Sequence, residues 1–332
     1  MAALRRSSGL ARIGLVRAVV IAIAIVSAIG ALLLALNWQP DRSVESLGAR
    51  WATAPSQFLR IDGMQVHVRD VGPRDDSLPL ILLHGTGASL HTWDGWAGAL
   101  SAKHRVITVD LPGFGLTGPQ PGADYSNERY VRFVMALADA LGVQRFALGG
   151  NSMGGEIAWE AAVAHPARVM KLILVDAGGY PLASRSVPIG FRIARTPLLN
   201  RVGDVTLPRS VVAASVRNVY GNPDRVTVDL VDRYYELTLR EGNRRALRQR
   251  LAQMQPGARA SLVLTIKTPT LILWGGQDRL IPPELARRFA QEISGSKLVI
   301  FEALGHVPHE EDPAATVVPV EQFLAIPAPR DE

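Results

Sequence analysis

FALGGNSMGGE, residues Phe146 to Glu156, runs from an apolar segment into a glycine-rich turn, and the small residues of 157–164 follow it. A strand, a sharp turn with serine at its apex and a helix form a nucleophile elbow, in which flanking glycines let the backbone bend and expose the serine oxygen. The helix N-terminus adds a positive dipole and free N–H groups. We therefore predict that Ser152 is a nucleophile, although G-x-S-x-G also occurs in ordinary glycine-rich turns.

The rest of the chain supplies the strands that such an elbow requires. Apolar runs of the kind found in strands buried on both faces recur at 78–83, 105–110, 171–176, 271–274 and 297–301. Helical stretches separate them, among them one that we expect to begin at Ser126 and to end near Gly142. Asp62-Gly63 joins two alternating runs and predicts a tight hairpin. This order indicates a doubly wound, mostly parallel sheet of the α/β class, with its active site at the carboxyl ends of the strands.

Between residues 181 and 265 this alternation stops. Helical stretches at 225–240 and 243–254 lie here between prolines and glycines, and the segment holds 14 arginines against six acidic residues, a net charge of +8. The predicted domains are an N-terminal membrane segment (1–38), a linker (39–55), a core in two parts (56–180 and 266–332) and a helical insertion (181–265). The charge of the insertion is expected to be either an ordinary solvated surface or a face for anionic lipid headgroups or carboxylates.

Five motifs in order carry a family resemblance: LHGTG at 83–87, DLPGFG at 110–115, GNSMGG at 150–155, WGGQD at 274–278 and GHVPHEE at 305–311. From about residue 57 onward the chain resembles the α/β-hydrolase superfamily. The similarity is to its cap-bearing serine branch, which includes esterases and carbon–carbon bond hydrolases. The resemblance implies an eight-stranded sheet, a helical cap formed by residues 181–265, and no cofactor or metal.

The resemblance also implies the site residues. Ser152, Asp278 and His306 match the family's catalytic triad, and Asp176 is the alternative acid. The backbone N–H groups of Thr86 and Met153 match the oxyanion hole.

Other residues near these motifs receive weaker predictions. Asn151 and Val307 are expected to contact substrate. His84 is expected to brace its loop through hydrogen bonds, His309 to be a structural loop histidine or part of the pocket wall, and Glu311 to anchor the loop that carries His306.

The expected reaction is hydrolysis of a carboxylic ester or thioester through an acyl-enzyme. A serine nucleophile disfavours the haloalkane dehalogenase and epoxide hydrolase branches, which need a carboxylate. Carbon–carbon hydrolases share the GNSMGG string but usually carry Trp after the catalytic His, where this chain has Val307. That reaction, cofactor-free haloperoxidase or perhydrolase chemistry, and a non-catalytic ligand-binding role remain open alternatives.

The N-terminal sequence predicts a membrane segment. Four arginines precede residues 18–36, which carry no charge, and Trp38 follows them. Nineteen residues at helical rise span roughly 28 Å, about the thickness of a hydrocarbon core. The positive-inside rule then places the catalytic domain on the periplasmic or extracytoplasmic side, with a cleaved signal peptide and a secreted periplasmic protein as the alternative.

The expected partners are a small-molecule ester, with a membrane-derived one as an option, and the membrane itself. Nucleic acid is not expected, because four of the six net positive charges precede the folded part. The chain has no cysteine, which excludes disulfides and thiolate metal sites. Gly113, Gly115 and Gly118 spell G-x-G-x-x-G, but prolines follow where a dinucleotide site requires a helix.

Overall fold

One eight-stranded sheet, in the order β1-β2-β4-β3-β5-β6-β7-β8, forms the centre of the computed structural model, which describes residues 2–181, 184–196 and 199–327. β1 and β2 form an antiparallel hairpin, β2 also pairs antiparallel with β4, and the remaining pairs are parallel. The predicted α/β fold with its mostly parallel sheet is thus confirmed. The strands are β1 (Ser56–Ile61), β2 (Met64–Val71), β3 (Leu80–Leu83), β4 (Val106–Val109), β5 (Phe146–Asn151), β6 (Val169–Val175), β7 (Thr270–Gly275) and β8 (Lys297–Phe301).

The hairpin forms because its turn residues accept left-handed backbone angles. Asp62 has φ 49° and Gly63 has φ 80°, and the pairing of Ile61 with Met64 closes the turn directly around them. Two successive positive φ angles are what the commonest two-residue hairpin turn needs. The predicted hairpin is therefore present.

Helices cover both faces of the sheet, as the all-apolar strands require. In β3, Ile81 and Leu83 join the core on one face, while Leu80 and Leu82 join the core on the other. The first core includes side chains of α4 (Asn127–Ala140), α5 (Met153–Ala164) and α11 (Glu284–Glu292), and the second includes side chains of α3 (Asp94–Leu100) and α13 (Pro313–Ala325). Short helical turns join these elements: η1 (Leu90–Trp93), η2 (Pro121–Ala123) and α12 (Pro308–Glu311).

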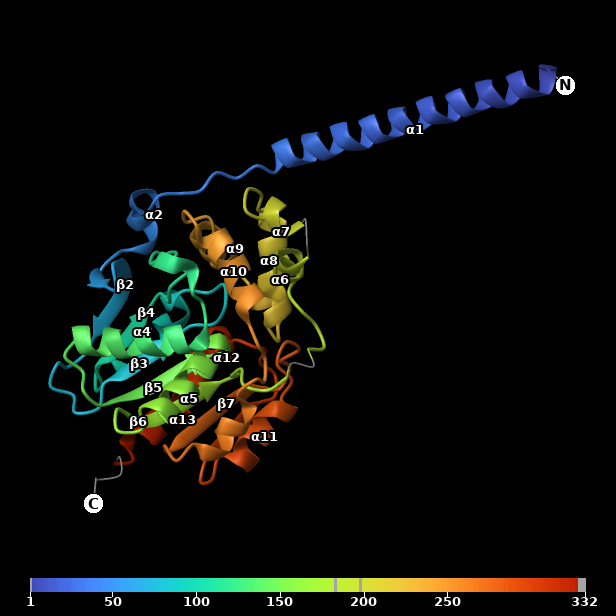
Figure 1. Cartoon of the computed structure of the whole chain (residues 1–332). Coiled ribbons are helices and arrows are strands. Elements are labelled where there is room, and N and C mark those ends of the chain that lie inside the picture. Colours follow the sequence, from blue (N-terminus) through green and yellow to red (C-terminus); the bar gives the residue numbers. More distant parts are fainter. Residues whose placement is uncertain (1, 182–183, 197–198, 328–332) are drawn as a thin grey trace.

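The insertion between β6 and β7 is helical and lies over one end of the sheet (Figure 1). Its longest helices are shorter than expected: the stretch predicted at 225–240 is a helix only from Val228, where the Thr227 hydroxyl caps it by accepting from the Leu230 amide. The helices of this cap are α6 (Ile189–Arg195), α7 (Leu199–Val202), α8 (Arg209–Val219), η3 (Pro223–Arg225), α9 (Val228–Thr238), α10 (Asn243–Gln253) and η4 (Ala260–Thr265).

The segment predicted as a linker contains a helix and binds the cap. The Gln39 amide donates to Val205 O, the Arg42 amide donates to Leu239 O, and α2 (Val44–Trp51) begins at Ser43. The Trp51 indole donates to Glu236 of α9 at 2.7 Å. The sequence did not indicate these contacts, because the partners lie between 166 and 197 residues further along the chain.

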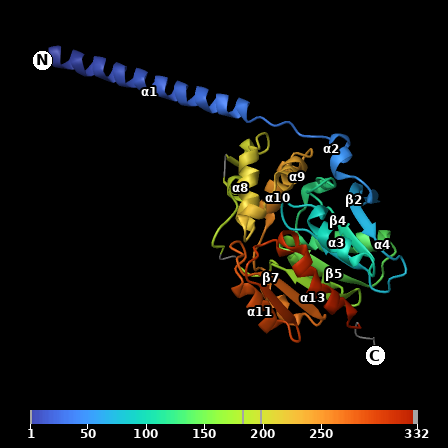
Figure 2. The same cartoon turned by 180° about the vertical axis from the view of Figure 1, so that it is seen from behind.

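The N-terminal helix α1 (Ala2–Leu36) projects away from the rest of the chain on the side of the cap (Figures 1 and 2). Its stretch Leu15–Leu36 has 22 residues, a mean hydropathy of 3.0 and no burial against the rest of the chain. By length and composition this helix could serve as a membrane anchor or as a signal sequence.

Candidate active site

Ser152 occupies a strained turn between β5 and α5. Its φ of 55° and ψ of −115° lie outside the ordinary regions for a side-chain-bearing residue. The flanking glycines make this turn possible: a Cβ on Gly150 would lie 2.2 Å from Gly154 O, and one on Gly154 would lie 2.2 Å from Leu83 O. The structure therefore has the geometry of the predicted elbow.

His306, in the loop after β8, is held by Asp278, in the loop after β7. His306 Nδ1 lies 2.7 Å from Asp278 Oδ2, while Asp278 Oδ1 accepts from the amides of Leu280 and Ile281. The two side chains are buried, with Asp278 1% and His306 4% exposed. Because the carboxylate requires a proton on Nδ1, the other ring nitrogen, Nε2, is left to accept one. Ser152 and His306 line the same cavity.

Asp176, the alternative acid, lies next to this pair but has a different state. Burial and the adjacent Asp278 raise the pKa of Asp176 well above its usual range, which favours the protonated form of its carboxyl group. One of its oxygens accepts from the Gly275 amide. The geometry thus favours Asp278 over Asp176 as the partner of His306.

Asp176, Asp278 and His306 each bring one potential metal-ligand atom within 4.8 Å of the others. The donor set fits a metal poorly. The raised pKa of Asp176 makes its carboxyl group a weaker ligand, and the Asp278 carboxylate already bonds the imidazole and two amides.

The loop after β3 lies against the elbow. A Cβ on Gly85 would lie 2.8 Å from the side-chain oxygen of Asn151, and the Thr86 hydroxyl lies 3.4 Å from the sulfur of Met153. Met153 is the first residue of α5, so its amide has no acceptor within the helix. The two amides predicted to form an oxyanion hole thus belong to segments in direct contact, and that role remains a prediction.

His84 braces this loop, as expected. Its Nδ1 is 2.8 Å from Gly85 O, and its Nε2 accepts from the Leu111 amide at 2.9 Å. Burial lowers the pKa of His84, which keeps the ring neutral and matches this pair of bonds.

Glu311 and His309 also have structural roles. The Glu311 carboxylate accepts from the amides of Gly305, Gly221 and Asn222, which anchors the His306 loop to the cap. His309 is stacked on Trp93 with ring centroids 4.0 Å apart, and burial holds its pKa well below the usual range. Both expectations are confirmed.

Asn151 and Val307, the predicted substrate contacts, both line the cavity. The Asn151 amide group donates to Val175 O at 3.1 Å and to His306 O at 2.9 Å, so both of its N–H donors are used within the protein. Val307 belongs to an apolar cluster with cap residues. A role in substrate binding remains a prediction for both.

The cavity has two arms that meet at Ser152. The larger arm, about 350 Å³, extends under the cap, and the smaller one, about 220 Å³, extends between α4, α5 and α10. Thr86, Ser152, Phe191 and Leu280 line both arms. The walls of the larger arm are mostly apolar and include Ile193, Val202, Leu207, Val211, Val212 and Leu247.

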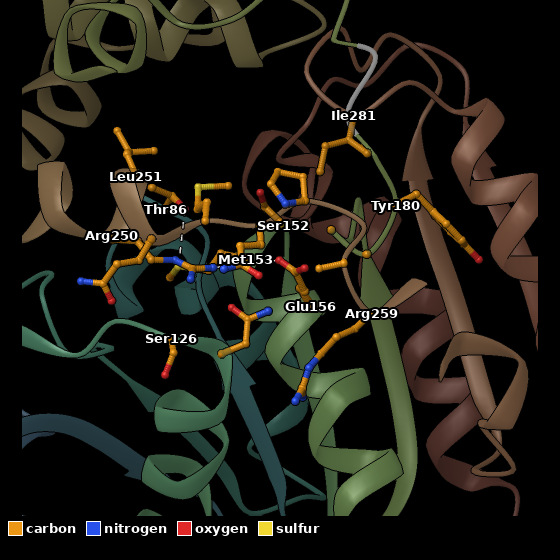
Figure 3. Close-up of a pocket in the computed structure, with 18 of the residues that line it drawn as sticks. Thr86, Ser126, Ser152, Met153, Glu156, Tyr180, Arg250, Leu251, Arg259 and Ile281 are labelled. Atoms are coloured by element: carbon orange, nitrogen blue, oxygen red, sulfur yellow. Dashed lines mark hydrogen bonds and ion pairs between the residues drawn. The ribbon is translucent and has the colours of Figure 1, made fainter. Parts of the chain in front are cut away.

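Sequence reasoning missed two buried polar groups beside this cavity. The first is Glu310, which accepts from the Tyr220 and Tyr234 hydroxyls and pairs with Arg233, so it ties α12 to cap helices. The second is the pair of Glu156 and Arg250 in the smaller arm (Figure 3). The one available signal was a glutamate four residues after Ser152, in a helix whose other residues, apart from Glu160, are apolar or small.

Comparison with known proteins agrees with this architecture. Residues 79–313 match the model of the alpha/beta hydrolase fold family. The chain belongs to this family. A solved α/β-hydrolase, a meta-cleavage product hydrolase from Pseudomonas fluorescens, superimposes with a TM-score of 0.70 at 24% identity, covering 81% of this chain and 97% of that one.

The chain is also similar to proteins with other names. It is 30% identical over 310 residues to an uncharacterised protein of Mycobacterium tuberculosis, covering 89% of this chain and 86% of that one. It is also 30% identical to a 2-hydroxy-6-oxo-2,4-heptadienoate hydrolase of Pseudomonas putida, and the match covers 79% of this chain and 94% of that one. The structure of a membrane phospholipase A, a bacterial virulence factor, has a TM-score of 0.69 at 26% identity, covering 94% and 96%.

Proposed function

We propose that this hydrolase cleaves carboxylic esters through an acyl-enzyme on Ser152. The observation that carries the proposal is the position of Ser152 where the His306–Asp278 pair meets a largely apolar cavity arm. Such an arm suits an acyl chain, because burial of each methylene contributes about 0.8 kcal/mol. The membrane phospholipase, whose structure covers 94% of the chain, supports the same class of reaction.

The residues perform the reaction in two steps. His306 takes the proton of Ser152 as the serine oxygen attacks the acyl carbon, and Asp278 stabilises the imidazolium that forms. The amides of Thr86 and Met153 stabilise the oxyanion, and loss of one such donor typically costs about 3 to 4 kcal/mol. The alcohol leaves with the proton from His306, and a water activated by His306 then releases the acid.

A carbon–carbon bond hydrolase is the second candidate. The Pseudomonas putida relative, 30% identical over 278 residues, favours it. Val307, in place of the tryptophan usual after the histidine of that branch, favours the ester reaction instead.

We further propose that α1 anchors the enzyme in a membrane, with the catalytic domain on the extracytoplasmic side. Four arginines in the first 17 residues and the apolar stretch Leu15–Leu36 support an anchor. A new N-terminus after Trp38 on the protein recovered from cells would show cleavage and refute the anchor.

Ester hydrolysis is tested with Ser152→Ala and a series of p-nitrophenyl esters of increasing chain length. We expect the wild type to hydrolyse these esters and to be labelled at Ser152 by a fluorophosphonate. Ser152→Ala should lose both properties and still unfold at the wild-type temperature, which shows that it is folded. A dienoate ring-cleavage product, assayed in parallel, distinguishes the second candidate. Ester turnover by Ser152→Ala near the wild-type rate would refute the proposed nucleophile.

A further inference from the structure

The smaller arm of the cavity differs from the larger one in its polar lining. Figure 3 shows Glu156 on α5 and Arg250 on α10 around this arm, together with Ser152. Glu156 lies one helical turn after the serine, and its amide donates to Ser152 O. A molecule attached to Ser152 can therefore reach the carboxyl group of Glu156 through this arm.

Arg250 is nearly inaccessible, at 2% exposed, and its guanidinium is only partly satisfied by the protein. One terminal nitrogen donates to Tyr125 O at 2.8 Å, and the group lies over the ring of Tyr130. Among the described residues, its Nε has no acceptor. Its other terminal nitrogen lies 4.0 Å from a carboxylate oxygen of Glu156 in the lining of this arm, so a ligand group that accepts from that nitrogen would be stabilising.

Glu156 is also only loosely paired. Its carboxylate lies 4.0 Å from Arg250, beyond hydrogen-bond distance. Burial and the neighbouring Glu160 raise the pKa of Glu156 to about 7, while Arg250 and a side-chain hydrogen bond from Asn127 limit the rise. Glu160, one turn further along α5, is different: Asn127 donates to it at 2.7 Å and Arg259 at 2.9 Å, so its oxygens are held by the protein.

The mixture of charges indicates what kind of group fits. A phosphate or carboxylate group would be attracted by Arg250 but repelled by Glu156 and Glu160. An ammonium group would be attracted by the two glutamates but repelled by Arg250. A hydroxyl group both donates and accepts, so it can satisfy Glu156 and Arg250 together. An unsubstituted alkyl group would satisfy neither.

We propose that the smaller arm binds the hydroxyl-bearing alcohol portion of the substrate, and that the preferred substrates are partial esters of polyols with an apolar acyl chain. The acyl chain occupies the larger arm under the cap, and the ester carbonyl lies at Ser152. Water provides the oxygen that enters the acid, the bond between the acyl carbon and the alcohol oxygen breaks, and the polyol leaves through the smaller arm. This inference rests on the ester hydrolysis proposed above.

The test compares glyceryl monooctanoate with ethyl octanoate, using the full-length protein in detergent. We expect the wild type to have the higher kcat/KM for the glyceryl ester. Glu156→Met, which keeps the size and removes the polar atoms, should reduce the ratio of the two kcat/KM values roughly ten- to hundred-fold, the factor for one hydrogen bond to a charged group. Most of that loss should lie in KM, and Glu156→Gln, which still donates and accepts, should retain most of the preference.

Val211→Phe is the matched control, because Val211 lines only the larger arm. It should change the preferred acyl length and leave the ratio of glyceryl to ethyl ester as in the wild type. A wild type that prefers the ethyl ester, or a Glu156→Met variant with an unchanged ratio, would overturn the inference while ester hydrolysis stands. If Glu156→Met does not fold, the inference is tested by the wild type alone, which must have a higher kcat/KM for the glyceryl ester than for the ethyl ester. Absence of Ser152-dependent turnover of either ester would overturn the proposed function itself.

Discussion

Replacement of Glu156 by Gln should stabilise the protein, and increasingly so as the pH rises. Burial raises the folded-state pKa of Glu156 to about 7 from the ordinary 4.5. At a pH below both values the carboxyl group is protonated in the folded and unfolded chains and has no effect. Between them the unfolded chain ionises first, so the wild type loses stability as the pH rises. Above pH 7 the carboxyl group is ionised in both states, so the full cost of burying its charge lowers the stability of the wild type. Glutamine carries no charge and avoids this cost.

The size of the effect follows from the pKa difference. About 2.5 pH units at roughly 1.36 kcal/mol each give a stabilisation of about 3 kcal/mol at pH 8 and about 1 kcal/mol at pH 5. With an unfolding entropy of roughly 2.1 cal/mol/K per residue, a chain of 332 residues has about 0.7 kcal/mol/K, so the Tm should rise by roughly 5 °C at pH 8.

The assay is thermal unfolding followed by tryptophan fluorescence, for the full-length protein in detergent at pH 5 and pH 8. Glu284→Gln is the control, because Glu284 is exposed and pairs with Arg185 on the surface, and its pKa is lowered rather than raised. It should give no gain in Tm at pH 8. An equal Tm shift for Glu156→Gln at both pH values, or a lower Tm at pH 8, would refute the reasoning.

Two further predictions concern the oxyanion loop and the membrane. Gly85→Ala would place a methyl group 2.8 Å from the side-chain oxygen of Asn151 and 3.2 Å from Cβ of Ser152. The loop would have to shift, so we expect kcat for a short ester to fall roughly 10²- to 10³-fold, the effect of losing one oxyanion donor. A kcat equal to that of the wild type would contradict this role of the loop. Many cap arginines are paired with acids, but within the described residues five exposed ones form no ion pair: Arg192, Arg195, Arg201, Arg217 and Arg245. If these arginines contact anionic lipid, each contributes about 1 kcal/mol to membrane binding. Activity of the full-length protein on esters in anionic vesicles should then fall with added salt, while activity on short soluble esters should change little. Equal salt responses for the two substrates would indicate that these arginines form an ordinary solvated surface.

Most of the core fold was predictable because its information is local. The apolar runs of β3 to β7 are buried on both faces, and no other environment suits strands without an alternating pattern. Asp62-Gly63 and the glycines around Ser152 have backbone angles or approaches that other residues rarely tolerate. Ser126 likewise predicted a helix start, because its hydroxyl accepts from the amide of Arg129.

The contacts of the N-terminal segment were not predictable in the same way. Nothing near Gln39 or Trp51 in the sequence indicates that they bond to Val205 and Glu236. Those contacts exist because the cap and the segment before β1 meet in space, where Leu47 also packs in an apolar cluster with Leu237, and neither sequence specifies the distant segment that it contacts.

The sequence by itself determined the elbow and a mostly parallel α/β sheet, because turn geometry and strand burial leave marks on neighbouring residues, and its resemblance to the α/β-hydrolases indicated Ser152, Asp278 and His306 as candidates. The resemblance already favoured Asp278 over Asp176, and the tertiary structure shows the bond from His306 to Asp278, while Asp176 accepts from the Gly275 amide instead. Only the tertiary structure decided that Glu156 faces Arg250, across 94 positions of sequence, in a cavity arm of its own. Charge and hydrogen-bond complementarity between distant segments depends on their separation in space, and that separation is fixed only when the cap closes over the sheet.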